Sequence, residues 1–332
     1  MVVNDFCAAE VFGDKTTLGT ALEQGDYSPT GPYGPITSWD VTAVKNFDSI
    51  ISSLSNVATF NGDVSQWDVS GVTSMNSAFL NAAAFNVPLT DWVVSGVTNM
   101  ASMFESSGFN ADVSTWVTSS VNNMDFLFKN NGAFNQPVNG WDTSKVTTMD
   151  SLFLANVKFN QPVNDWDVSS VTLMDRLFRG CTVFNQPLSN WDVSKANNMR
   201  RMFRTSAFNQ NINNWDVSSN TEFTSMFYEA TAYNQPLNNW DTSIGKKFDI
   251  MFFGASLFNQ NVATWDVGAA TTFSEMFSGA TVFGYDLCAW GDKITGTPTI
   301  TSMFASTACT EAATPVDLGA TPKGPFCEVC TP

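Results

Sequence analysis

Tryptophan spacing constrains the fold of this chain more than any other feature of its sequence. The chain of 332 residues holds 11 tryptophans, and each follows the previous one after 24, 25 or 28 residues. A sequence period of roughly 20–50 residues is typical of solenoids, propellers and other repeat arrays. The length alone would suggest two or three globular domains, but the spacing predicts one quasi-linear repeat domain. The tryptophans are Trp39, Trp67, Trp92, Trp116, Trp141, Trp166, Trp191, Trp215, Trp240, Trp265 and Trp290.

Each interval between tryptophans carries the same residue types at the same places. One unit reads W-D-T-S-K-V-T-T-M-D-S-L-F-L-A-N-V-K-F-N-Q-P-V-N-D from Trp141, and the next reads W-D-V-S-S-V-T-L-M-D-R-L-F-R-G-C-T-V-F-N-Q-P-L-S-N from Trp166. A single unit of this size cannot bury its own Trp, Met and Phe, whereas stacked units can. The recurring apolar places are therefore predicted to form one continuous core.

The apolar spacing after each Trp predicts a short helix. Val171, Met174, Leu177 and Phe178 recur at the intervals that place side chains on one helix face. Thr172 is predicted as the N-cap of this helix. The Trp-Asp-Val-Ser segment is too short for a helix and is predicted to be extended. Each unit should thus comprise a short strand, a turn, a helix and an Asn-Gln-Pro corner.

Stacking would align each repeat position into a ladder along the array. The Asn after the second aromatic of each unit is predicted to bond backbone groups of adjacent turns, because buried corner backbone needs partners. The Asp after each Trp is predicted to accept backbone N–H bonds near the following Ser. Binding of Ca²⁺ or another hard cation between turns is the alternative for this Asp row, which Val93 and Val117 interrupt. The Asn ladder includes Asn135, Asn160, Asn185 and Asn234, and the calcium alternative concerns Asp142, Asp167 and Asp192.

Composition excludes several classes of function. The chain has no histidine, which removes Ser-His-Asp and Cys-His catalysis and histidine metal sites. Its net charge of −16 argues against nucleic acid and against docking on an anionic membrane. No run approaches the roughly 18 apolar residues of a transmembrane helix, and residues 1–10 lack the pattern of a signal peptide. We expect neither an enzyme nor a resident cofactor.

The repeated W-D-V-S-x-V-T-x-M-x-x-[ML]-F-x-x-A-x-x-F-N-Q-P-L unit resembles the BspA-like surface-protein repeat of bacteria and algae, a relative of the leucine-rich repeat. The resemblance covers the chain from Trp39 to Phe304. It implies a right-handed, leucine-rich-repeat-like α/β solenoid of about 10–11 turns, with one short strand and one short helix per turn. It also implies a secreted or cell-surface protein, whose signal peptide is not in this chain.

The ends of the chain depart from the repeat, as terminal repeats must present a polar outer face. We expect an N-terminal cap at 1–36, the repeat solenoid at 37–304 and a cysteine-containing C-terminal cap at 305–332. With the surface-protein resemblance, two disulfides among the four clustered cysteines are the first prediction, and three pairings are open. A zinc site of four thiolates is the alternative, and a thioredoxin-like role for the Cys-x-x-Cys pair lacks a βαβ context. The four are Cys288, Cys309, Cys327 and Cys330, whereas Cys181 is predicted as a buried free thiol and Cys7 lies too far away to pair with the four.

All five arginines lie within one short segment of an otherwise acidic chain. Equivalent repeat positions should bring them together as a basic patch on the outer helix face of two adjacent turns, with Lys195 near in sequence. A solvated face with Asp175 and Glu229 as partners is one interpretation. The other is a binding site for an acidic partner. The candidate residues are Arg176, Arg179, Lys195, Arg200, Arg201 and Arg204.

Two functions fit these features. The first is a non-enzymatic structural and adhesion protein of the cell surface that acts by protein–protein contact, including self-assembly into a filament or coat. The second is a monomeric recognition module for acidic polysaccharides or a host protein. Neither involves nucleic acid or membrane insertion of this chain.

Overall fold

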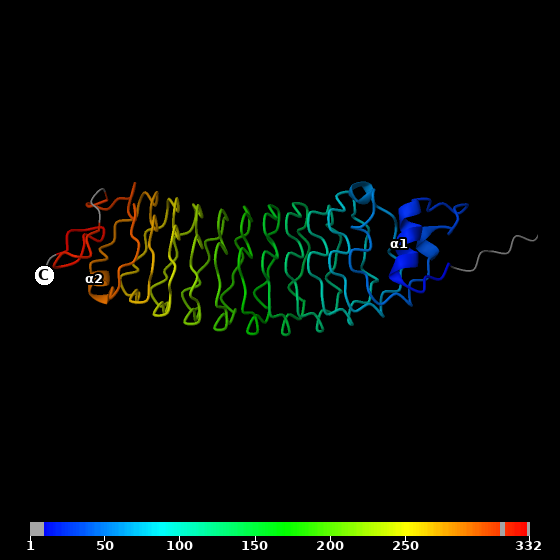
Figure 1. Ribbon diagram of the computed structural model, residues 1–332, viewed down its shortest axis with the longest axis horizontal. Coiled ribbons are helices and arrows are strands. Elements are labelled where there is room, and N and C mark those ends of the chain that lie inside the picture. The colour runs from blue at the N-terminus through cyan, green and yellow to red at the C-terminus, as the bar shows by residue number, and fades with distance from the viewer. Residues whose placement is uncertain (1–9, 313–315, 331–332) are drawn as a thin grey trace, which may run out of the picture.

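The protein is an elongated stack of turns that runs from one capped end to the other (Figure 1). The computed structural model describes residues 10–312 and 316–330. Helix α1 (Lys15–Gln24) lies at one end of the stack and helix α2 (Ala289–Lys293) near the other. Two 3₁₀ helices, η1 (Ile36–Ser38) and η2 (Val57–Thr59), complete the helical elements of the described residues. No helix within these ranges has both the length and the apolar character needed to span a membrane.

One parallel β-bridge joins each pair of successive turns between Asn46 and Thr299, and no described strand extends beyond such a bridge. From Asn46 to Thr272 the bridging residue stands seven places after the Trp of its turn. The bridged positions are Asn46, Ser74, Asn99, Asn123, Thr148, Leu173, Asn198, Glu222, Lys247, Thr272 and Thr299.

The predicted fold class is therefore wrong. The leucine-rich-repeat-like α/β solenoid requires a strand and a helix in every turn, and the turns from Trp67 to Trp265 contain no helix and no strand longer than a single bridge. The segment from Val171 to Phe178, predicted as a helix, contains a β-bridge at Leu173 and tight turns from Asp175 onward instead. Thr172 is not a helix N-cap: its hydroxyl donates to the carbonyl of Thr147 in the preceding turn, at 3.3 Å. The apolar residues do face inward, but they project from a bridge and tight turns and not from a helix.

Left-handed residues explain why no helix forms. In the turn of Trp141, Ser151 has φ 55° and Ala155 has φ 57°. A right-handed helix cannot pass through such residues, because L-residues in the left-handed region point the backbone the other way. The first position recurs as Ser49, Ser77, Ser102, Phe126, Ser151, Arg176, Arg201, Ser225, Ile250, Glu275 and Ser302, and the second as Asn81, Ser106, Asn130, Ala155, Gly180, Thr205, Glu229, Gly254, Gly279 and Ser306.

The backbone of this segment hydrogen-bonds to the next turn instead of to itself. The N–H groups of Met149, Ser151, Phe153 and Ala155 donate to carbonyls of the following turn at distances of 2.7–3.0 Å. The N–H groups between them close tight turns, as Leu154 does on the carbonyl of Ser151 at 3.1 Å. Since buried backbone groups must be paired, each turn depends on its neighbour for this pairing.

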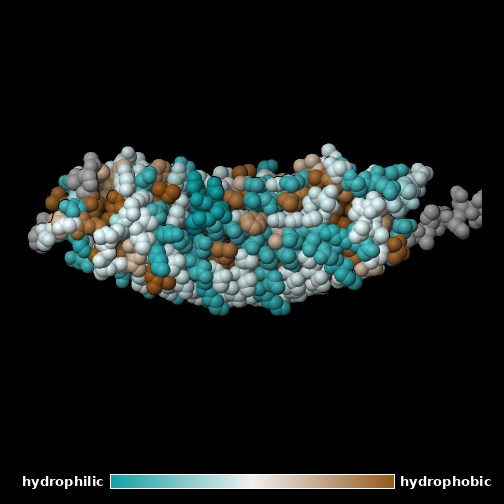
Figure 2. Space-filling model, in the orientation of Figure 1, coloured by the Kyte–Doolittle hydropathy of each residue, from teal (hydrophilic) through white to brown (hydrophobic). Residues whose placement is uncertain are grey.

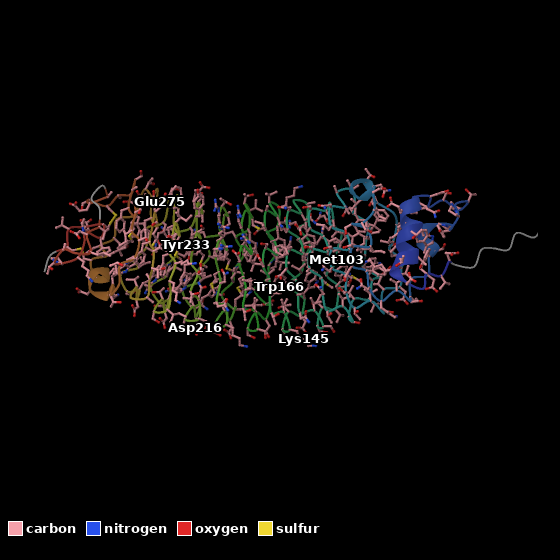
Figure 3. All side chains as sticks on the ribbon, in the orientation of Figure 1. Met103, Lys145, Trp166, Asp216, Tyr233 and Glu275 are labelled. Carbon is pink, nitrogen blue, oxygen red and sulfur yellow. A yellow bond between two sulfur atoms is a disulfide. The ribbon has the colours of Figure 1, made fainter. Side chains whose placement is uncertain are left out.

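Tryptophan adds a side-chain bond between turns. The indole N–H of Trp166 donates to the carbonyl of Val138 in the preceding turn, at 2.9 Å. The indoles from Trp67 to Trp290 all make the equivalent bond, at 2.8–3.1 Å. Trp166 is buried, and Figure 3 places it inside the stack.

Phenylalanine rings fill the space beside the tryptophans in two files. Phe153 stacks on Phe159 of its own turn with ring centroids 3.8 Å apart, and on Phe178 of the next turn at 5.7 Å. Both interplanar angles are small, 13° and 7°. Met103 likewise lies inside the stack (Figure 3). The core is one layer repeated turn after turn, as predicted from the sequence period.

Helix α1 covers the first turns of the stack. Asp14 caps its N-terminus by accepting from the backbone N–H groups of Thr16 and Thr17 at 2.8 and 2.9 Å. Leu18 and Leu22 are fully buried on its inner face. This helix lies within residues 1–36, the segment predicted as the N-terminal cap.

Loss of one indole N–H should destabilise the whole stack. We expect Trp166→Phe to lower the free energy of unfolding by about 2–3 kcal/mol, because the Val138 carbonyl loses one of its two donors and a void remains. Tyr233→Phe is the matched control: its buried hydroxyl has no partner among the described residues, so its removal should be neutral or stabilising. Urea unfolding measures both. Equal losses in the two variants would contradict the role of the indole bond.

Exchange of Gly and Ala at the second left-handed position tests whether the backbone has these turns or a helix, because the two conformations predict opposite changes in stability. Ala155→Gly should raise the free energy of unfolding by about 1 kcal/mol, because Gly adopts positive φ without strain. Gly180→Ala, at the same place in the next turn, should lower it by a similar amount, since its φ is 73° and its new Cβ would lie 3.3 Å from Ala155 Cα. A helix would show the opposite signs in urea unfolding.

Candidate functional site

The Asn ladder joins successive turns through side-chain hydrogen bonds. The side-chain oxygen of Asn135 accepts from the backbone N–H of Asn160 at 2.9 Å, and that of Asn160 accepts from Asn185 at 3.0 Å. Asn209 continues the row to Asn234 at 2.9 Å. These amides connect neighbouring turns, the structural role expected of them.

The Asp row forms local turns. The carboxylate of Asp142 accepts from the backbone N–H and the hydroxyl of Ser144, at 3.0 and 2.7 Å. Asp167 and Asp192 each accept from the backbone N–H two residues ahead, at 3.0 Å. Among the described residues, no group of three or more Cys, Asp or Glu is placed to hold a metal ion. The geometry thus matches the turn interpretation, and nothing in it favours calcium.

The Asp row lies along one long edge of the stack. Figure 3 shows Asp216, a member of the row, at the lower edge, together with Lys145. Val93 and Val117, which interrupt the row in adjacent turns, expose 53% and 56% of their surface. Apolar side chains thus replace charge at one place on this edge.

Two disulfides close the C-terminal end, as predicted. Cys288 pairs with Cys330, and Cys309 pairs with Cys327, with Cα–Cα distances of 5.4 and 4.7 Å. This pairing leaves no set of four thiolates for zinc. Cys181 is a free, fully buried thiol, and burial raises its pKa far above the ordinary value. Cys7 lies outside the described residues.

Two of the five arginines are neutralised by buried or partly buried carboxylates. Arg200 contacts Asp175 through two nitrogens, at 2.9 and 3.4 Å, and Arg176 contacts the same carboxylate at 3.0 Å. Asp175 is only 4% exposed, and Asp150 lies 3.7 Å from Arg176. Arg200 and Arg176 therefore connect three consecutive turns through ion pairs.

The other three arginines have no ion pair with any described residue. Burial, and then the guanidiniums of Arg204 and Arg176, lower the pKa of Arg179. Burial and neighbouring arginines, including Arg179, also lower the pKa of Arg201. The Nε of Arg201 is buried without a hydrogen-bond partner in the described part of the chain. Three positive groups thus lie together with uncompensated charge.

The remaining predicted members of the basic patch lie elsewhere. Lys195 has the repeat position of Lys145, at the lower edge of Figure 3, whereas Arg176 and Arg201 have the position of Glu275, at the upper edge. The structure therefore separates Lys195 from the arginines. Glu229 makes no ion pair with a described arginine. The patch also lies on consecutive tight turns, not on a helix face.

Two aromatic residues that the sequence reasoning missed continue the arginine row. The guanidinium of Arg204 lies over the ring of Tyr228 in the next turn, with Cζ 4.0 Å from the centroid. Tyr228 in turn stacks on Phe253 at 4.9 Å with an interplanar angle of 7°. Arg179, Arg204, Tyr228 and Phe253 share one repeat position, 13 places after their Trp. This shared repeat position is the sequence signal from which the row could have been predicted.

Comparison with known proteins identifies the family. The model described as "Mycoplasma protein of unknown function, DUF285" matches residues 30–138, 105–215 and 204–314. The chain belongs to the DUF285 family. The DUF285 segments together span all 11 tryptophans, so the family and the stack of turns coincide. No curated protein and no solved structure matches the chain.

Hydrogen bonds in the turns of the Asp row should lower the carboxyl pKa values measured by acid titration. The Ser144 hydroxyl and N–H hold the pKa of Asp142 below its ordinary value. A folded pKa below the unfolded value of about 3.9 stabilises the protein above about pH 4, and this stabilisation is lost as the pH falls through the folded pKa. Ser144→Ala should raise the Asp142 pKa toward the unfolded value and weaken that acid dependence.

Carboxyl ¹³C shifts followed against pH measure this change. Asp192 is the internal control, since its partner Ser194 is untouched and its own pKa is lowered in the same way. An Asp142 midpoint that stays where it was in Ser144→Ala would show that the hydroxyl does not set it.

Proposed function

We propose that this DUF285 chain is a non-enzymatic structural and adhesion protein of the cell surface, acting by contact through its outer rows. The observation that carries the proposal is the division of each turn into a recurring inner layer and a varied outer edge. Trp, Met and Phe recur inside and are buried. The residue 13 places after Trp changes from Glu105 to Lys129, Leu154, Arg179 and Arg204 in successive turns. Such a scaffold displays side chains in register over a long surface.

The two disulfides support a location outside the cytoplasm. Disulfides persist in oxidising compartments and are rare in reducing ones. The resemblance of the repeat unit to BspA-like surface repeats favours the same location. The DUF285 match shows the repeat family but not this location. The absence of histidine from the sequence favours a role without catalysis.

Both ends of the stack are covered, which favours lateral contact over end-to-end growth by added turns. Helix α1 buries Leu18 and Leu22 at one end. At the other end, the backbone N–H of Leu287 donates to Phe326 of the C-terminal segment at 3.1 Å. Among the described residues, segments that do not follow the repeat therefore occupy both places where a further turn would stack. Self-assembly into a coat or bundle would use the sides of the stack.

Surface labelling with cysteine mapping tests this proposal. Protein on intact, unpermeabilised cells should be reached by antibody and by added protease. Its tryptic map should show Cys288 joined to Cys330 and Cys309 to Cys327, and Cys181 should react with an alkylating reagent only after unfolding, because it is fully buried. Light scattering of the purified protein over a concentration series then reports lateral assembly.

Labelling that appears only after permeabilisation, together with four reduced cysteines in the C-terminal segment, would overturn a surface location. A monomer at every concentration would leave recognition of a separate partner as the mode of contact.

A further inference from the structure

Four residues at one repeat position form a continuous row along the outer edge, which we name the Arg–aromatic track: Arg179, Arg204, Tyr228 and Phe253. Backbone bonds fix their order on consecutive turns. The N–H of Gly180 donates to Arg204 at 2.8 Å, that of Thr205 to Tyr228 at 2.8 Å, and that of Glu229 to Phe253 at 2.6 Å. All four side chains are partly exposed. The track therefore presents two cations followed by two stacked rings on four consecutive turns.

Neither Arg179 nor Arg204 makes an ion pair with a residue that the structure describes. Asp175 is held by Arg176 and Arg200, so the nearest buried carboxylate does not neutralise Arg179 or Arg204. Equivalent core rings in these four turns lie 6.0, 5.6 and 5.4 Å apart, which gives the turn-to-turn spacing beneath the track. Arginine guanidiniums suit planar carboxylate and sulfate groups, since they can donate two parallel hydrogen bonds.

We propose that the Arg–aromatic track binds a linear acidic polysaccharide, with its sulfate or carboxylate groups on Arg179 and Arg204 and its sugar rings against Tyr228 and Phe253. The inference rests on the proposed contact function and deepens it by naming a partner for one surface. A polymer fits because the track is linear and in register over four turns. Arg204 and Phe253 cover the two faces of the Tyr228 ring, so a sugar ring would contact the exposed apolar edges of the two aromatic rings.

Other occupants fit less well. An extended peptide would add main-chain hydrogen bonds to a free edge, but the backbone N–H groups of Arg179 and Arg204 already close turns on Arg176 and Arg201. A nucleic acid would meet a chain of net charge −16 with few uncompensated cations. A second copy related by a two-fold axis through this surface would bring the two arginine clusters together, because they lie near the middle of the stack. The like charges would then repel each other.

Binding of defined polymers to the purified full chain tests the proposal. The probes are dextran sulfate, alginate and neutral dextran, with polyglutamate and single-stranded DNA as competing classes, all at low and high salt. We expect binding to dextran sulfate or alginate and none to neutral dextran. Dextran sulfate and alginate separate a sulfate from a carboxylate ligand.

Matched variants locate the binding to the track. Arg179→Gln with Arg204→Gln should weaken binding by about tenfold or more, since both charge-assisted contacts are lost. Lys145→Gln with Lys195→Gln removes the same charge from the opposite edge and should change binding less than about twofold. Tyr228→Leu with Phe253→Leu should weaken binding several-fold even at high salt, where charge is screened. Urea unfolding of each variant confirms that it is folded.

Three results would overturn the proposal: no binding to either acidic polysaccharide at low salt, equal losses in the two charge variants, or tighter binding of polyglutamate or DNA than of the polysaccharides. Each is independent of surface labelling and light scattering, so the contact function at the cell surface can stand or fall separately.

Discussion

Hydrogen bonding between neighbouring turns is the constraint on which this structure depends. Helices and sheets satisfy backbone groups within long, regular elements, but a turn of about 25 residues with two left-handed residues has no such element. Its N–H groups at Met149, Ser151, Phe153 and Ala155 are paired only when the next turn is in place. The Trp indoles and Asn side chains extend the same dependence to the other sides of the turn. Stability is thus a property of the stack and not of any unit.

The left-handed residues set a cost that the stacking must offset. An L-residue in this region is strained by roughly 1–2 kcal/mol, and β-branched residues such as Ile250 and Thr205 are found there as well. Ser, Asn and Gly occupy many of the other positions, where strain is smaller or a polar side chain can bond locally. Inter-turn bonds, buried rings and the Trp–carbonyl bonds hold these conformations in place.

The sequence predicted the period, the inward residues, the Asn and Asp bonding patterns and the two disulfides. It failed on the backbone, because Val171, Met174 and Leu177 have helical spacing yet also line one side of consecutive tight turns. A Ser recurs in the middle of several of the predicted helices and indicates a turn there, but this signal was overlooked. The residues are Ser77, Ser102, Ser151 and Ser225. Tyr228 and Phe253 could be joined to the arginines only by aligning every turn on its Trp. Ion pairing of Asp175 with Arg176 and Arg200 could not be read from spacing, since it depends on the left-handed turn that aims those side chains.

The same register connects fold and function. Because the inner layer recurs, the outer rows are free to vary, and at one place they vary into arginines followed by aromatic rings (Figure 2 shows the resulting mixture of hydrophilic and hydrophobic areas on the visible face). Arg176 and Arg201 share a repeat position, yet Arg176 pairs with Asp175 and Arg201 has no ion pair with a described residue. The carboxylates that neighbouring turns place beside each arginine, such as Asp175, therefore decide which charges hold the stack.

Scalar couplings across hydrogen bonds test the central claim most directly, since they identify the acceptor of each N–H. In the deuterated protein, the amide nitrogen of Ser151 should couple to the carbonyl carbon of Asp175 in the next turn, in accordance with their 2.8 Å bond. Met149 and Phe153 should couple in the same way to Leu173 and Leu177. Coupling of Ser151 to the carbonyl of Thr147, four residues earlier, would instead show a helix in each turn and contradict this account.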